Sequence, residues 1–125
     1  MSTIGHPLSD LMNMFTPYLT ADSNTPRSQP GFKPGKTPGL PTQDQILKWY
    51  SEVAGWDPTP EAAWGAAFSM FRLTCIFQGI AARWAVRQAS SAQAKETGAL
   101  MYPYGKISWN LVKLARDGNK NKAKL

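Results

Sequence analysis

The sequence has few of the residues on which most enzymes depend. Only one cysteine, Cys75, and one histidine, His6, occur in 125 residues. A single cysteine excludes an internal disulfide, and one His with one Cys cannot build the usual kind of zinc site or a His-based catalytic triad. These shortages argue against most self-contained enzymes, and they fit a reducing compartment.

Long uncharged apolar runs and a secretion signal are also missing. Arg72 and Arg83 interrupt the most apolar stretch, so no uncharged run reaches the ~18 residues that a membrane span needs. The N-terminus lacks the basic segment and apolar core of a secretion signal. We therefore expect an intracellular protein with no membrane span.

Acidic residues are scarce in the second half of the chain. Residues 62–125 contain ten Lys or Arg and two Asp or Glu. Residues 1–61 contain four Lys or Arg and six Asp or Glu, and the whole chain has a net charge of +6. Residues 118–125 continue this basic stretch and predict a frayed, solvated tail. Nucleic-acid binding through the basic half is an alternative, but no recognition motif supports it, and we do not expect nucleic acid as a partner.

No segment is convincing as a strand, and the pattern predicts an all-α fold. In residues 1–21, Pro7 suits the first position of a helix, apolar residues follow at helical spacing, and Pro17 should end or kink that helix. Residues 22–41 contain five prolines and three Pro-Gly pairs. That composition predicts an extended or disordered linker.

Residues 42–117 predict the helical body. Thr42 and Gln45 match a capping box for a helix that Gly55 closes. Three further helices are expected: one capped by Thr59 with Pro60 first and running from Ala62 to Val86, one from about Ser91 to Thr97, and, after a break at Tyr102-Pro103, one from about Tyr104 to Arg116.

The long helix from Ala62 to Val86 is apolar on nearly every face, and such a helix must be covered on all sides. Small residues along it, Gly65 and Gly79 among them, would let neighbouring helices approach closely. A chain of 125 residues with a long linker has little material for this covering. We therefore expect part of a larger helical lobe, or one partner of an oligomer.

Residues 4–11, IGHPLSDL, resemble the aminoglycoside phosphotransferase family, and more closely its branch related to the kinase-like domain of acyl-CoA dehydrogenase family members. That family typically has Gly-Asp-Pro-x-x-Asp-Leu here. This chain matches the motif at Gly5, Pro7 and Asp10, but it has His6 in place of the first Asp, the usual helix cap. His6 itself is interpreted as a capping or turn residue, with a catalytic base as the alternative. Three further stretches resemble the same branch: residues 41–50, 55–58 and 68–80. The resemblance covers most of residues 2–116.

The resemblance implies the C-terminal helical part of a protein-kinase-like fold, from a small-molecule kinase that uses ATP and Mg²⁺. The family's nucleotide-binding lobe, its catalytic loop and its Asp-Trp-Glu metal ligand would precede the matched segment. This chain contains none of these, so we expect no catalytic, cofactor-binding or metal-binding residue in it and no phosphate transfer by it alone. Asp10 would match a position that braces the catalytic loop, and it is equally a first-turn Asp that complements the helix dipole.

Trp64, Phe68 and Arg72 are the candidates to line the acceptor pocket of this lobe. An arginine among aromatic rings suits a phosphate or carboxylate, and core packing with a satisfied arginine is the alternative. The expected partner is the remaining kinase lobe or a protein that covers the apolar helix. A non-catalytic helical interaction module is the alternative function.

The terminal residues Ala123, Lys124 and Leu125 match the small–basic–leucine pattern of a peroxisomal address. Such a signal works at a free, exposed terminus, and the polar and basic residues before it suit that requirement. The pattern predicts the peroxisomal import receptor as a partner. Three residues also match by chance, and a cytoplasmic location is the alternative.

Overall fold

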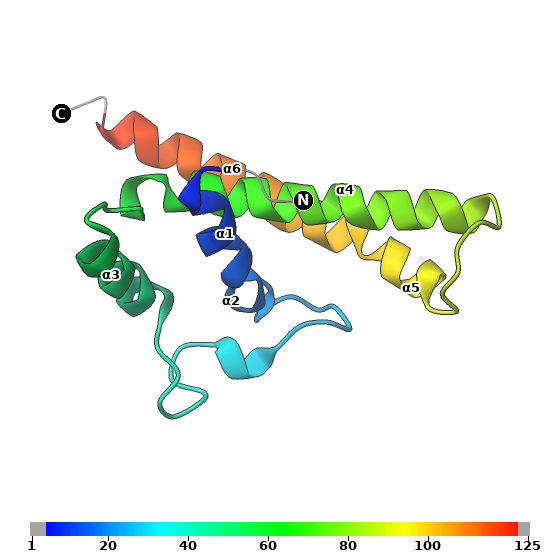
Figure 1. The fold of residues 1–125 in the computed structure, drawn as a ribbon, viewed down its shortest axis with the longest axis horizontal. Helices are drawn as coiled ribbons and strands as arrows, with labels where there is room; N and C mark the ends of the chain where they lie inside the picture. Colours follow the sequence, from blue (N-terminus) through cyan, green and yellow to red (C-terminus); the bar gives the residue numbers. More distant parts are fainter. Residues whose placement is uncertain (1–4, 123–125) are drawn as a thin grey trace.

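The computed structural model describes residues 5–122, and the side-chain surroundings of residues 5–118. Over residues 5–122 the chain forms α-helices and two 3₁₀ turns with no β-strand, which confirms the predicted all-α fold. The long helix α4 (Ala62–Ala85) lies along the long axis of the molecule (Figure 1). After the short helix α5 (Ala94–Ala99), α6 (Met101–Lys122) returns antiparallel along α4 (Figure 1).

Helix α1 (Pro7–Met14) begins at the predicted proline. His6 caps it, because its Nδ1 accepts a hydrogen bond of 3.2 Å from the backbone N–H of Leu8. The structural interpretation of His6 as a capping residue is therefore confirmed, since the imidazole replaces the carboxylate as acceptor. The helical path breaks at Phe15 and resumes as α2 (Thr16–Thr20), with Pro17 in the first turn of α2. The predicted break or kink is confirmed.

Residues 22–41 fold back on themselves, which corrects the expectation of an extended or disordered linker. Pro30–Phe32 form a 3₁₀ turn, η1, and no α-helix begins in this range. Gly35 and Gly39 have φ angles of 74° and 81°, which are left-handed values. A glycine in that conformation after proline makes a tight turn, so the Pro-Gly pairs compact the segment.

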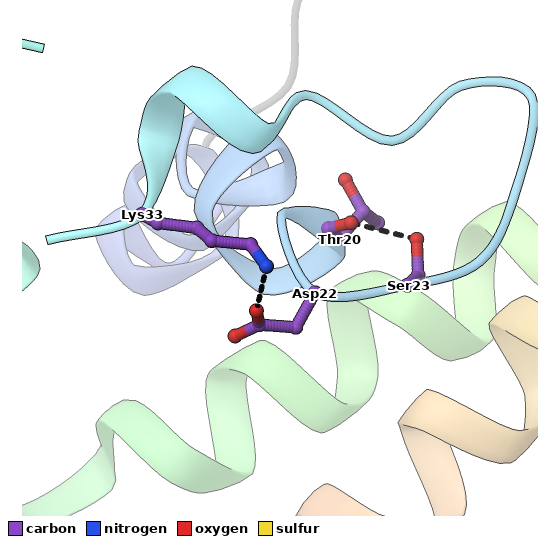
Figure 2. A network of polar contacts seen from close by, with 4 residues as sticks. All are labelled: Thr20, Asp22, Ser23 and Lys33. Atoms are coloured by element: carbon purple, nitrogen blue, oxygen red, sulfur yellow. Dashed lines mark hydrogen bonds and ion pairs between the residues drawn. The ribbon is translucent and has the colours of Figure 1, made fainter. Parts of the chain in front are cut away.

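Polar contacts attach this segment to the preceding helix (Figure 2). Lys33 reaches back to the carboxylate of Asp22, and the ion pair joins the end of η1 to the end of α2. Beside it, the hydroxyl of Ser23 donates to the carbonyl of Thr20 at 2.6 Å and extends the helix end by a turn.

Helix α3 (Gln43–Ala54) has the predicted ends. The N–H of Gln45 donates to the Thr42 hydroxyl at 3.3 Å, and the N–H of Thr42 donates to the Gln45 side chain at 2.8 Å. Gly55 closes the helix with a φ of 68°. Both capping predictions are confirmed. Leu47 is buried against α1, so α3 shares the core of the N-terminal helices.

The start of α4 differs from the prediction. Thr59 and Pro60 lie in a 3₁₀ turn, η2 (Thr59–Glu61), and α4 begins at Ala62 without a side-chain cap. The Asp57 carboxylate instead accepts a hydrogen bond of 2.9 Å from the backbone N–H of Thr59. The hydroxyl and the backbone N–H of Thr59 hold the pKa of Asp57 below its usual value. The side-chain hydrogen bond that precedes α4 therefore comes from an Asx turn at Asp57 and not from a Thr59 cap.

The end of α4 is a Schellman motif with an arginine where glycine is usual. The N–H of Arg87 donates to the carbonyl of Trp84 at 3.0 Å, and the N–H of Gln88 donates to the carbonyl of Arg83 at 2.8 Å. Arg87 has a φ of 58°, a left-handed conformation that costs a residue with a Cβ about 1–2 kcal/mol. These two hydrogen bonds and the left-handed Arg87 set the direction in which the following loop leaves α4.

Helices α5 and α6 both differ in extent from the prediction. Tyr102-Pro103 is not a break, because α6 begins at Met101 and a proline in the first turn loses no intrahelical hydrogen bond. The helix continues to Lys122, so the predicted frayed tail is helical over residues 118–122. Helix α5 begins at Ala94 rather than at Ser91. The predicted targeting residues Ala123, Lys124 and Leu125 lie outside the described residues.

The core has two clusters of buried apolar side chains. The first joins α1 to α3 and α4 and contains Leu8, Leu11, Met12, Phe15, Leu47 and Ala66. The second lies between α4 and the start of α6 and contains Met70, Phe77, Leu100 and Tyr104. Leu19 and Leu111 pack against both clusters, so the two are continuous.

Two glycines allow the closest helix approaches. A Cβ at Gly65 would lie 2.7 Å from the side chain of Leu8, and one at Gly98 would lie 2.8 Å from the Cα of Ala81. The expectation that small residues on α4 permit close packing is therefore confirmed at Gly65. It is wrong at Gly79, where a Cβ would meet nothing within 4 Å.

Helix α4 is not covered on all sides in this structure. Trp64 is 59% exposed and Phe68 53%, although the helix packs against α1, α5 and α6. By length and composition alone, the helix from Thr59 to Ala85 is apolar enough to cross a membrane, contrary to the expectation based on Arg72 and Arg83. A third of its most apolar stretch is buried here, and the core helix of a folded domain meets the same criterion.

Candidate functional site

Trp64 and Phe68 lie one turn apart on the exposed side of α4, with a shallow cleft on either side. The first, here called the α6 cleft, has a volume of about 250 Å³. It is lined by Trp64, Ala67, Phe68, Phe71, Gly105, Ser108, Trp109 and Val112. The second, the α1 cleft, has a volume of about 270 Å³. It is lined by His6, Leu8, Ser9, Glu61, Trp64, Gly65 and Phe68.

The α6 cleft is apolar along its walls. Its polar floor is already satisfied, because the Ser108 hydroxyl donates to the carbonyl of Ala67 at 2.9 Å and ties α6 to α4. The ammonium of Lys113, which is not a lining residue, lies 6.0 Å from the ring centroid of Trp109, so a positive charge stands beside one lining side chain. An apolar group with an anionic end fits this arrangement.

Arg72, the third predicted pocket residue, is not part of either cleft. Its guanidinium donates to the Ser9 hydroxyl at 3.3 Å and to the Asn13 amide oxygen at 2.9 Å. Both acceptors are on α1, so Arg72 holds α1 against α4. The structure thus brings Trp64 and Phe68 together and places Arg72 in a structural contact.

The N-terminal motif contributes one residue to the α1 cleft. The His6 ring packs edge-on against Trp56, with 5.5 Å between ring centroids, and it lines the cleft. Pro7 occupies the first turn of α1, while Gly5 and Asp10 are exposed. The motif therefore shapes the start of α1, and its acidic side chain faces solvent.

Sequence reasoning missed Phe71 and Trp109. Phe71 falls at helical spacing after Trp64 and Phe68, and this spacing was a usable signal. Trp109 comes from another helix, and only the antiparallel packing of α6 on α4 places it beside Phe68. Among the described residues, no three His, Cys, Asp or Glu side chains form a group that could hold a metal ion.

Comparison with known proteins finds relatives for nearly the whole chain. It is 30% identical over 115 residues to acyl-CoA dehydrogenase family member 10 of Mus musculus, and the match covers 88% of this chain. It is 29% identical over 116 residues to acyl-CoA dehydrogenase family member 11 of Rattus norvegicus, covering 89%, and 27% identical over 117 residues to that of Homo sapiens, covering 90%.

The chain spans only a small share of the curated relatives that it matches. The aligned region is 10% of the length of the mouse protein and 14% of the length of the rat and human proteins. No family model matches the chain, and no solved structure matches it. The similarity therefore relates this chain to one limited region of those larger proteins.

Proposed function

We propose that this chain is the acceptor-binding helical part of a kinase-like small-molecule phosphotransferase, with the resemblance to the aminoglycoside phosphotransferase family as its basis. The main support is the similarity over about nine-tenths of the chain to one region of acyl-CoA dehydrogenase family members 10 and 11. The motif around Gly5, Pro7 and Asp10, which carries the resemblance to the aminoglycoside phosphotransferase family, stands near the N-terminus of the chain.

The acceptor would lie against Trp64 and Phe68. The α6 cleft offers an apolar wall with the cation of Lys113 beside its lining Trp109, and the names of the relatives connect them with acyl groups. An acyl chain that carries a hydroxyl group would place its tail on these rings and its carboxylate near Lys113. Phosphoryl transfer also needs a nucleotide cradle, Mg²⁺ ligands and a base, which another part of the assembled kinase would supply.

Binding of a medium-chain hydroxy fatty acid to the purified chain, measured by titration calorimetry, tests this acceptor site. Trp64→Ala should weaken binding about tenfold, because loss of aromatic contact area costs about 1–2 kcal/mol. Trp84→Ala is the matched control, since Trp84 is a partly exposed tryptophan on the same helix outside both clefts. Equal effects of the two substitutions, or no binding, would contradict the proposal.

A phosphotransfer assay tests the claim that the chain alone is inactive. Purified chain with ATP, Mg²⁺ and the same hydroxy acid should give no more turnover than a control reaction without the protein. Robust turnover that one substitution within the chain abolishes would show a complete active site here.

The exposed apolar residues of α4 favour a second candidate, a non-catalytic helical interaction module. Trp64, Phe68 and Phe71 are each more than half exposed and lie on one helix. Such a surface predicts self-association or binding of a hydrophobic dye. A monomer in sedimentation measurements that binds no dye would exclude this candidate.

We also propose that the terminal Ala123-Lys124-Leu125 directs the chain to peroxisomes. A fluorescent protein placed before Met1 leaves this terminus free. The fusion should give punctate peroxisomal fluorescence, and removal of Leu125 should make it diffuse. Diffuse fluorescence of the intact fusion would instead support the cytoplasmic alternative.

A further inference from the structure

A separate cavity lies at the far end of α4, where residues 86–93 turn back into α5. Its volume is about 350 Å³, which is within the ~300–1,000 Å³ typical of small-molecule sites. It shares no lining residue with the α1 and α6 clefts. It is therefore independent of the acceptor site proposed above.

Two arginines from distant parts of the chain line this cavity. Arg27 comes from the folded linker and Arg83 from the last turn of α4, and no carboxylate is among the lining residues. Neither guanidinium forms an ion pair with a residue that the structure describes. Two like charges at one cavity without a counter-ion repel each other, so a bound anion would stabilise the arrangement.

Both guanidinium groups are held by neutral acceptors. A terminal nitrogen of Arg27 donates to the Thr97 hydroxyl at 3.4 Å, and Nε of Arg83 donates to the carbonyl of Gly79 at 3.2 Å. The Arg27 guanidinium also lies 5.7 Å from the ring centroid of Phe77. The positive charge of Arg27 also acts on Tyr104. Burial raises the pKa of Tyr104, and the charge of Arg27 lowers it in part. Arg27 is exposed, and its guanidinium lies over the buried ring of Phe77.

The rest of the lining suits a phosphate ester. The Thr97 side chain accepts from Arg27, which leaves its proton for a ligand oxygen, and Ser90 adds a second hydroxyl to the lining. Ile80 supplies an apolar wall. The Schellman motif at Arg87 fixes the loop that carries Ser90.

We propose that this cavity binds the phosphate group of a small phosphorylated organic compound, with Arg27 and Arg83 as its main ligands. Guanidinium groups bind phosphate oxygens through paired, charge-assisted hydrogen bonds, which makes two arginines a strong oxyanion site. The organic part of the ligand would lie against Ile80.

Titration calorimetry at constant ionic strength, with glycerol 3-phosphate and inorganic phosphate as probes, tests the site. Arg83→Gln should weaken binding of glycerol 3-phosphate at least tenfold. Arg27→Lys keeps the charge, removes the paired donors and should weaken it several-fold. Arg116→Gln, an exposed arginine on α6 that does not line the cavity, is the matched control and should change the affinity less than twofold.

Three results would overturn the proposal. The first is the absence of saturable binding, and the second is an equal loss in Arg83→Gln and Arg116→Gln, which would indicate attraction to the overall positive charge. The third is equal affinity for the two probes, which would assign the cavity to free phosphate. Circular dichroism of each variant establishes that the helical fold is retained.

Discussion

Gly98→Ala tests whether the backbone approach of α5 to α4 is as close as the structure indicates. The new Cβ would lie 2.8 Å from the Cα of Ala81 and 2.9 Å from its backbone nitrogen. Carbon atoms in contact are ~3.5–4.0 Å apart, so the two helices must separate by roughly 0.7 Å. The obstacle is backbone and cannot rotate away.

Two opposing contributions decide whether Gly98→Ala raises or lowers the free energy of unfolding. Overpacking costs about 1–3 kcal/mol, whereas alanine gains up to ~1 kcal/mol over glycine within a helix. We therefore expect Gly98→Ala to lower the free energy of unfolding by about 1–2 kcal/mol. Gly79→Ala is the control: its Cβ meets nothing within 4 Å, so it should raise the free energy of unfolding by up to ~1 kcal/mol.

Urea unfolding followed by circular dichroism measures both variants. A Gly98→Ala variant as stable as the parent, or more stable, would refute the close approach. Equal destabilisation of both variants would mean that the loss does not come from the contact between Gly98 and Ala81.

Substitutions at four further positions have expected outcomes in the same unfolding measurement. Ser69→Ala should leave stability unchanged or raise it by up to ~1 kcal/mol, because the buried Ser69 hydroxyl has no hydrogen-bond partner among the described residues. Ser108→Ala should lower it by about 1 kcal/mol, and equal effects of the two serines would contradict this reasoning. His6→Ala should cost about 1 kcal/mol, whereas His6→Asn keeps a cap and should not; a harmless His6→Ala would argue against capping. Arg87→Gly should add about 1 kcal/mol and Arg87→Ala almost nothing, and no gain with glycine would mean that the left-handed turn carries no strain.

Features set by neighbouring residues were predictable from the sequence. The capping box of Thr42 and Gln45, the closing Gly55 and the break caused by Pro17 all depend on short-range geometry. Pro103 was misread because proline disfavours a helix interior but is tolerated in a first turn, and the sequence does not say where a helix begins.

The candidate sites depended more on packing. Trp64 and Phe68 share one helix, so their spacing was enough to place them together. Arg72 was a candidate for the same site, with packing of a satisfied arginine as the alternative. The structure shows the alternative, and the two polar partners of Arg72 on α1 are brought near only by the tertiary fold. That Arg27 and Arg83 line the same cavity likewise could not be predicted, because the linker must first fold back onto the end of α4.

The short reversal between α4 and α6 has a consequence for the order in which the molecule assembles. Closing it orders few residues, so the helical hairpin around Met70 and Tyr104 loses little chain entropy when it forms. The N-terminal helices must close a longer path, across the proline-rich segment, to bury Leu47 beside α1. We therefore expect the hairpin to form first and α1 and α3 to dock on it later.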